Sequence, residues 1–278
     1  MARREIVKTV RGRRATDGAG VRLVRVLGYD DTREFDPFLM LDSFDSTNPE
    51  DYLPGFPMHP HRGIETVTYL ISGRIEHEDS LGNKGVITDG ESQWMTAGSG
   101  ILHQEMPKAC PRMLGFQLWL NLPAAEKMCE PAYLGITAAD MPEVALDGAT
   151  LRVISGRYGE TVGVTPRHIP ATLYDIRLAP GASLTLPTRR GETVFVFLID
   201  GDGLVNGQPT AAKTAVLFGD GDEILLAAKP EAGVRVIFYS GQALHEPIAW
   251  GGPIVMNTQL ELALAFDELN RGTFIRPR

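Results

Sequence analysis

The chain has 278 residues, of which 43% are hydrophobic and 22% charged, and its formal net charge is −8. This composition is typical of a globular protein and argues against a disordered or fibrous chain. The acidic balance argues against a nucleic-acid-binding surface, because phosphate groups are bound mainly by lysine and arginine, and two cysteines are too few for a disulfide framework.

The N-terminal segment is the dense basic stretch of the chain. It contains Arg3, Arg4, Arg11, Arg13 and Arg14, and we interpret it as a solvated, partly frayed end. The segment lacks the apolar region of a signal peptide, and no apolar run approaches the ~18 residues of a membrane helix. We therefore expect a cytoplasmic protein, monomeric by default, that binds neither membrane nor nucleic acid directly.

Short strands follow between about residues 66 and 122. Runs rich in valine, isoleucine, threonine and aromatic residues alternate with the turns LGNKG (81–85) and DGE (89–91), and MLGFQLWLNL (113–122) is the last run. This pattern is typical of a β-meander or a β-barrel. Residues 123–148 lack such alternation and indicate a connection, with a short helix at about 124–128.

The strand pattern returns from residue 151, with hairpin signals at the DGDG (200–203) and NG (206–207) turns. The two halves also resemble each other, because GIETVTYLISG (63–73) is echoed by GETVFVFLIDG (191–201). We therefore predict an all-β fold of two tandem barrels with a few short helices. The expected domains are residues 1–130, a linker at 131–150, and residues 151–278.

The C-terminal segment has the pattern of an amphipathic helix. Thr258 and Glu261 have the spacing of a capping box, and Leu262, Phe266 and Leu269 follow at helical intervals. We expect this helix to pack on a barrel.

Two short motifs carry the candidate chemistry. His59 and His61 are two residues apart, and His103 and Glu105 repeat that spacing. Residues at this spacing in a strand point to the same face, so three imidazoles and one carboxylate can converge if the two strands are close. This donor set suits divalent iron, manganese, nickel, copper or zinc.

The stretch from HPHRGIETV to ILHQEMP (59–107) resembles the signature of the pirin family in the cupin superfamily. The resemblance extends to DPFLMLDSF (36–44) and GGPIVMNTQLEL (251–262). It implies cupin (jelly-roll) barrels and an iron(II) ion held by His59, His61, His103 and Glu105. Glu65, at the carboxylate position usual in cupins, would then not bind the metal, although its parity suggests that it faces the barrel interior.

The resemblance also implies two kinds of role. Some pirins are quercetin 2,3-dioxygenases, which open flavonols with dioxygen, and here Glu105 would take the proton of the flavonol hydroxyl. Others bind enzymes or transcription factors as metal-dependent, redox-sensing regulators, so a protein partner is the alternative. A third hypothesis is a cupin isomerase or hydrolase-like enzyme that works without oxygen.

The remaining candidates are weaker. The second half has Thr188, Arg189 and Arg190 near the place of the first-half histidines, so we expect one metal ion per chain. His77 is expected to be hydrogen-bonded or solvated, and Gln117 could bind a metal-bound group. Apolar residues near the motifs are expected in the core or in the wall of an aromatic pocket: Phe38, Phe56, Met58, Trp94, Met106 and Phe116.

Overall fold

The computed structural model describes residues 1–276 and divides into two compact units. One unit, called the histidine unit here, comprises Arg14–Thr32, Phe38–Thr137 and the chain from Leu244 onward. The other, called the second unit, comprises Met1–Arg13, Arg33–Pro37 and Ala138–Ala243. The domain boundaries expected at residues 130 and 150 stay a prediction, and residues 277–278 of the expected C-terminal domain lie outside the described residues.

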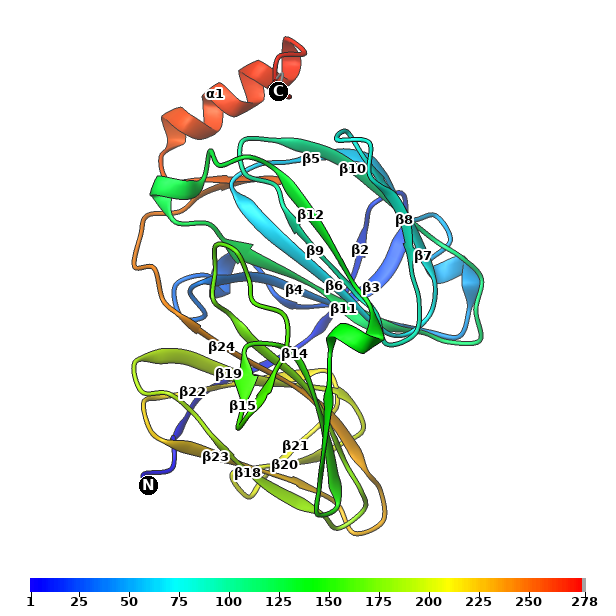
Figure 1. Ribbon diagram of the computed structural model, residues 1–278, viewed down its shortest axis with the longest axis vertical. Helices are drawn as coiled ribbons and strands as arrows, with labels where there is room; N and C mark the ends of the chain where they lie inside the picture. The colour runs from blue at the N-terminus through cyan, green and yellow to red at the C-terminus, as the bar shows by residue number, and fades with distance from the viewer. Residues whose placement is uncertain (277–278) are drawn as a thin grey trace. The chain divides into compact units, whose positions relative to one another are not determined.

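The histidine unit is built from strands, three short 3-10 helices and α1. Its elements are β2 (Arg13–Asp17), β3 (Val21–Leu27), η1 (Tyr29–Asp31), β4 (Phe38–Ser46), η2 (Pro49–Asp51), β5 (Phe56–His61), β6 (Ile64–Ser72), β7 (Ile75–Asp79), β8 (Lys84–Ile87), β9 (Ser92–Thr96), β10 (Ile101–Pro107), β11 (Met113–Asn121), η3 (Ala124–Glu126), β12 (Ala132–Ile136), β25 (Ala249–Gly251), β26 (Ile254–Met256) and α1 (Gln259–Asn270). A seven-stranded sheet has the order β12-β9-β6-β11-β4-β3-β2, and a four-stranded sheet has the order β5-β10-β7-β8 (Figure 1).

The second unit follows the same plan. Its elements are β1 (Ile6–Arg11), η4 (Ala138–Asp140), β13 (Glu143–Leu146), β14 (Ala149–Ser155), β15 (Arg157–Tyr158), β16 (Thr161–Val162), β17 (Thr172–Leu178), β18 (Ser183–Pro187), β19 (Glu192–Asp200), β20 (Gly203–Val205), β21 (Gln208–Thr210), β22 (Thr214–Phe218), β23 (Glu223–Ala228) and β24 (Val234–Gln242). Its sheets run β1-β22-β19-β24-β17-β14-β13 and β18-β23-β20-β21.

The strand order confirms the internal repeat. Strands β4 to β11 occupy the same positions in their sheets as strands β17 to β24 occupy in theirs, and the two echoed sequences form β6 and β19. The predicted NG hairpin joins β20 to β21, with Asn206 at φ 50° and Gly207 at φ 79°. The fold is therefore all-β, with two tandem cupin barrels.

The prediction of a frayed N-terminus is wrong. Strand β1 pairs with β22, from Ile6 opposite Phe218 to Arg11 opposite Thr214. The side chain of Arg4 is only 1% exposed, and it donates hydrogen bonds to Thr188 Oγ1 (2.8 Å) and to the carbonyl of Gly219 (2.6 Å). Strand β1 thus forms the edge of the sheet. Its pairing with β22 gives backbone hydrogen bonds to groups that a frayed end would expose to water.

The interiors of the two barrels differ in polarity. The core of the second unit consists of aliphatic and aromatic residues from both of its sheets. The inside of the histidine unit instead contains buried polar side chains, among them Thr68, Gln93, Glu105 and Gln117. Buried polar groups are costly unless they have partners, so this polar interior marks where a functional site is to be sought.

The C-terminal helix forms as predicted. At the start of α1, the Thr258 hydroxyl accepts a hydrogen bond from the backbone N–H of Glu261. The Glu261 carboxylate in turn accepts one from the backbone N–H of Thr258. The apolar face of the helix, with Leu262 and Phe266, packs against strands β25 and β26. Among the described residues, no helix has the length and hydrophobicity to cross a membrane.

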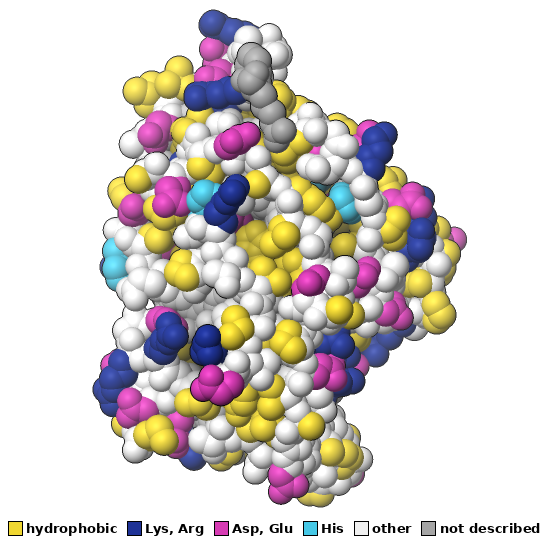
Figure 2. All heavy atoms as spheres, in the orientation of Figure 1, with side chains coloured by type: hydrophobic (Ala, Val, Ile, Leu, Met, Phe, Trp, Pro, Cys, Tyr) yellow, Lys and Arg dark blue, Asp and Glu magenta, His cyan; other side chains and the backbone are white. Residues whose placement is uncertain are grey.

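Smaller expectations can also be compared with the structure. The segment expected as a linker contains strands β12 and β13, and η3 lies where a short helix was expected. Both Cys110 and Cys129 are free thiols. On the face drawn in Figure 2, acidic and basic side chains are interspersed.

Candidate metal centre

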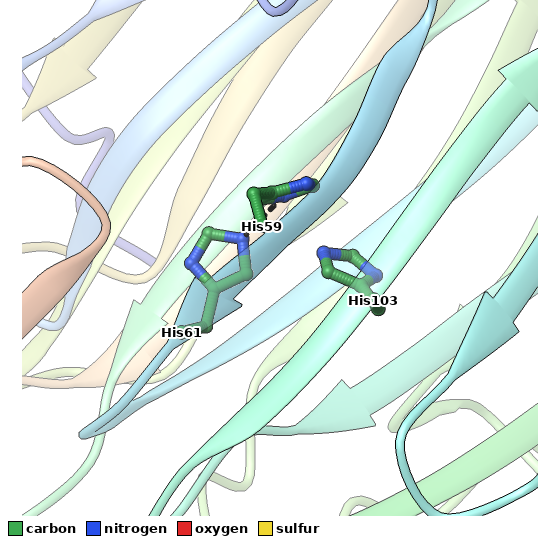
Figure 3. A group of neighbouring side chains, drawn as sticks. All are labelled: His59, His61 and His103. Atoms are coloured by element: carbon green, nitrogen blue, oxygen red, sulfur yellow. Dashed lines mark hydrogen bonds between the residues drawn. The ribbon is translucent and has the colours of Figure 1, made fainter. Parts of the chain in front are cut away.

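Three histidines from two neighbouring strands come together in the histidine unit. His59 and His61 lie on β5, and His103 lies on β10 directly opposite His59 in the antiparallel pair. The three rings point toward one another (Figure 3), with centroid distances of 4.8, 4.4 and 5.0 Å. The candidate ligand atoms all lie within 4.8 Å of one another, so the expected convergence of the two motifs is found for these histidines.

Backbone carbonyls fix the tautomers of two of these imidazoles. The carbonyl of Pro57 lies 2.9 Å from Nδ1 of His59, and the carbonyl of Pro253 lies 3.0 Å from Nδ1 of His61. A carbonyl can only accept, so each Nδ1 carries the proton and each Nε2 presents a lone pair. The two Nε2 atoms are 3.0 Å apart. Two lone pairs at this distance repel unless a proton or a cation lies between them.

Burial keeps two of these imidazoles neutral. His61 is 2% exposed, and burial followed by the neighbouring His59 lowers the pKa of His61 to about 3. Burial, followed by the neighbouring His61 and His59, lowers the pKa of His103 well below its usual value, and Nε2 of His103 has no hydrogen-bond partner among the described residues. Ligand nitrogens around one metal ion, each bonded at about 2.1 Å, lie roughly 3 to 4 Å apart. The 3.0 Å separation of the His59 and His61 Nε2 atoms and the neutral state of His61 and His103 therefore fit a metal ion.

Glu105 lies two residues after His103 on β10 and is 1% exposed. Its Oε1 accepts hydrogen bonds from Thr68 Oγ1 (2.9 Å) and from the Gln93 amide, and the Gln117 side chain is close enough to the carboxylate to favour its ionised form. Its Oε2 has no partner among the described residues. Burial raises the pKa of Glu105. The carboxylate is not within the 4.8 Å group of the histidines, so its role as a ligand stays a prediction.

The expectation that Glu65 faces the barrel interior is wrong. Strand β5 ends at His61 and β6 begins at Ile64, with Gly63 at φ 77° between them, so the alternation of side chains does not continue across this turn. Within β6, Thr68 contacts Glu105 inside the barrel. Glu65 is three residues earlier and therefore lies on the opposite face of the sheet, where Thr96 donates to its carboxylate (2.7 Å).

His77 is buried and hydrogen-bonded rather than grouped with the other histidines. It is 7% exposed, and its Nε2 lies 2.6 Å from the hydroxyl of Tyr133, whose ring stacks on it at 4.5 Å. The same hydroxyl lies 3.4 Å from the Gln93 side-chain oxygen. Gln93 and Tyr133 could not be predicted as site residues, because neither belongs to a recognisable motif.

Two buried cations fasten the turn that follows His61. Nζ of Lys127 donates to the carbonyls of Gly63 (2.8 Å) and Val255 (3.0 Å) and to Asn121 Oδ1 (2.7 Å). The guanidinium of Arg62 donates to the carbonyl of Phe274 (2.9 Å) and lies over its ring. The turn is therefore held by residues from the far C-terminal part of the sequence.

A pocket with a volume of about 680 Å³ opens beside the histidines. This volume lies in the usual range for small-molecule sites. Of the apolar residues suggested as its wall, Phe56 lines it, whereas Met58 is 47% exposed and Phe38, Trp94 and Phe116 are buried. Further lining residues, which no sequence motif marks, are Asp17, Arg25, Tyr29, Asp42, Trp119 and Trp250.

Among residues 1–276, the histidine cluster is the one group of three or more metal-ligating side chains. At the corresponding place in the second unit, Thr188 Oγ1 and the carbonyl of Arg189 bind the guanidinium of Arg4. A cation of the chain itself thus occupies that turn. This arrangement agrees with the expectation of one metal ion per chain, which stays a prediction.

Comparisons with known proteins agree with this fold. The family model described as Pirin matches residues 20–120, and the one described as Pirin C-terminal cupin domain matches residues 173–275. A pirin-like protein of Caulobacter vibrioides is 42% identical, covering 98% of this chain and 99% of the relative, and human pirin is 38% identical, covering 94% and 91%.

A solved structure is similar over nearly the whole chain. The crystal structure of quercetin 2,3-dioxygenase from Acinetobacter baumannii has a TM-score of 0.90 and 35% sequence identity, and the match covers 98% of this chain and 99% of that one. With both family models covering most of the sequence and full-length relatives at this identity, the chain belongs to the pirin family of cupin proteins.

Proposed function

We propose that the protein is a metal-dependent dioxygenase of the quercetin 2,3-dioxygenase type, with His59, His61, His103 and Glu105 holding one iron(II) ion. The observation that carries this proposal is the convergence of three imidazoles beside a pocket with aromatic walls. The similarity to the Acinetobacter baumannii quercetin 2,3-dioxygenase supports the choice of substrate class and of dioxygen as co-substrate.

The donor set determines which chemistry the metal can contribute. Histidine nitrogens with one carboxylate leave coordination positions open, and iron(II) in such a site supplies Lewis acidity and reactivity toward dioxygen. Manganese, nickel, copper and zinc accept the same donors, so iron(II) is the first metal to be tested rather than the one that the donors select.

The chain's own residues then have defined tasks. The carbonyls of Pro57 and Pro253 orient His59 and His61, as second partners commonly do for metal-bound histidines. Thr68 and Gln93 hold Oε1 of Glu105, so the partnerless Oε2 is the atom that would bind the metal and, once it has left the metal, take the proton of the flavonol hydroxyl. A base with a raised pKa accepts this proton more readily.

The pocket walls position the flat ring system. Trp119 packs edge-on against His61 at 4.9 Å, and Trp250 lies 5.7 Å from Trp119. Such aromatic surfaces favour stacked or edge-to-face contacts with a planar ligand. They also exclude water from the reacting ring, to which dioxygen adds with release of carbon monoxide.

The test is reconstitution of the metal-free chain with iron(II), followed by measurement of quercetin loss, oxygen uptake and metal content. We expect turnover in the wild type and its loss in His59→Ala. His168→Ala, which changes a histidine outside the cluster, is the matched control and should retain activity. Stoichiometric iron without turnover would contradict the proposal and favour the regulator alternative, for which the next measurement is partner binding by each oxidation state of the iron.

A further inference from the structure

A charged cluster that the proposed chemistry does not use lines the same pocket. Arg25 on β3 makes a two-pronged ion pair with Asp42 on β4, from Nε to Oδ1 (2.9 Å) and from Nη2 to Oδ2 (2.7 Å). Its Nη2 also donates to Asp17 Oδ2 (2.6 Å). The side chains of Asp17, Arg25 and Asp42 are 47%, 35% and 4% exposed, so the cluster extends from the pocket mouth into its wall.

This cluster is linked to the metal centre by the sheet. Asp42 lies directly opposite Gln117 on β11, and the Gln117 side chain is close enough to the Glu105 carboxylate to favour its ionised form. Asp17 is close enough to His59 for the two groups to interact electrostatically. A ligand that reaches the histidines can therefore contact the cluster with its other end, since both line a single pocket.

The cluster presents a donor beside an acceptor. The hydrogen bonds of Arg25 to described residues use Nε and Nη2, which leaves the N–H groups of Nη1 for a ligand. Asp17 is half-exposed, and each of its oxygens accepts one hydrogen bond, from Gly18 N (2.7 Å) and from Arg25. A carboxylate oxygen can accept a further bond.

The charge of the cluster restricts what it can bind. Burial raises the pKa of Asp42 to about 6, so this carboxylate is still ionised at neutral pH. One guanidinium and two carboxylates then carry one net negative charge. Such a site repels sulfate, phosphate or carboxylate groups, and it suits a neutral group that both donates and accepts hydrogen bonds.

We propose that Arg25 and Asp17 determine substrate specificity by binding two adjacent hydroxyls on the pendant ring of a flat aromatic substrate. One hydroxyl accepts from Nη1 of Arg25, and its neighbour donates to the carboxylate of Asp17, while Asp42 holds the guanidinium in place. This inference rests on the proposed function, and it narrows the substrate class to neutral polyhydroxylated flavonols.

The experiment measures binding rather than turnover. Calorimetric titrations of the iron(II)-loaded chain under anaerobic conditions compare quercetin, which carries the two adjacent hydroxyls, with a matched flavonol whose pendant ring has none. Since a hydrogen bond to a charged group is worth about 1.5–3 kcal/mol, we expect the wild type to bind quercetin at least tenfold more tightly. Asp17→Asn should lose most of this difference, whereas Asp202→Asn, which removes an exposed partner of Lys229 outside the pocket, should keep it.

Each outcome decides the inference. The inference is supported if Asp17→Asn, but not Asp202→Asn, loses the preference for quercetin over the matched flavonol. It is also supported if a pendant-ring sulfate ester of quercetin binds the wild type more weakly than it binds Asp17→Asn. Equal binding of both flavonols by the wild type, or a preference that survives in Asp17→Asn, overturns the specificity role while the proposed function stands. If neither flavonol binds the wild type, both this inference and the proposed function fail. Because Asp17 is half-exposed, the substitution is expected to leave the fold intact.

Discussion

The metal-free protein should lose stability in acid because of His61. This side chain is fully buried, and its pKa is lowered to about 3, whereas an unfolded histidine titrates near 6.5. Between these values the unfolded chain binds a proton that the folded chain does not. The stability that His61 contributes is therefore complete above about pH 6.5 and is lost as the pH falls toward about 3.

The magnitude follows from the two pKa values. From about pH 8 down to about pH 4.5, the unfolded side chain gains its proton over about two pH units while the folded one remains neutral. At about 1.36 kcal/mol per unit, the loss is roughly 2.7 kcal/mol. The pKa of Glu105 is raised by burial, so its contribution to the free energy of unfolding changes with pH in the opposite direction. The contribution of His61 must therefore be measured by comparison with a variant.

The assay is urea unfolding of the metal-free chain at these two pH values, in the wild type and in His61→Asn. The asparagine keeps a donor for the Pro253 carbonyl but cannot titrate. We expect the stability advantage of the wild type over the variant to shrink by roughly 2.7 kcal/mol in acid. An advantage of equal size at both pH values would refute the reasoning, because it would mean that His61 is not held neutral by burial.

Two further predictions concern the base and the turn. Glu105→Gln should lower quercetin turnover by about a hundredfold or more, because the amide cannot take the hydroxyl proton; unchanged turnover, at a metal content equal to that of the wild type, would rule out the base role. Gly63→Ala should destabilise the fold far more than Gly82→Ala, since both glycines have positive φ but a Cβ at residue 63 would lie 2.0 Å from the Val255 carbonyl while nothing lies within 4 Å at residue 82. Thermal melting of both variants tests this difference. Equal decreases in Tm would contradict the prediction, because they would mean that the backbone near Val255 moves away from the new Cβ without loss of stability.

Patterns in the sequence were sufficient for the fold class and for the two motifs of the histidine cluster. The spacing of two residues places His59 and His61 on the same side of β5, and the repeated GETV-type strands indicate duplicated barrels. The meeting of His103 with His59 depends in addition on the pairing of β10 with β5. The capping box of α1 is predictable because its partners Thr258 and Glu261 are three residues apart.

The remaining features depend on contacts between distant parts of the chain. Nothing in the local sequence shows that the Pro253 carbonyl would meet His61, or that Arg4 would be buried against residues nearly two hundred positions away. The prediction that Glu65 points to the same face as His59 and His61 was also wrong. A turn at Gly63 separates β5 from β6, so the alternation of side chains does not continue from one strand to the next. The pocket cluster of Arg25 and Asp42 likewise joins two strands whose pairing only the folded sheet reveals.

The dependence of the β5–β6 turn on the C-terminal segment has a consequence for the order of events during synthesis. All the histidines of the cluster leave the ribosome well before Pro253, which orients His61, and before Val255 and Phe274, which accept hydrogen bonds from Lys127 and Arg62. Domains fold as their residues emerge, yet this centre stays unfinished until the chain is almost complete. A metal ion would therefore meet the fully oriented site only in the finished protein, because a nascent or prematurely terminated chain carries the histidines without the contacts that orient them.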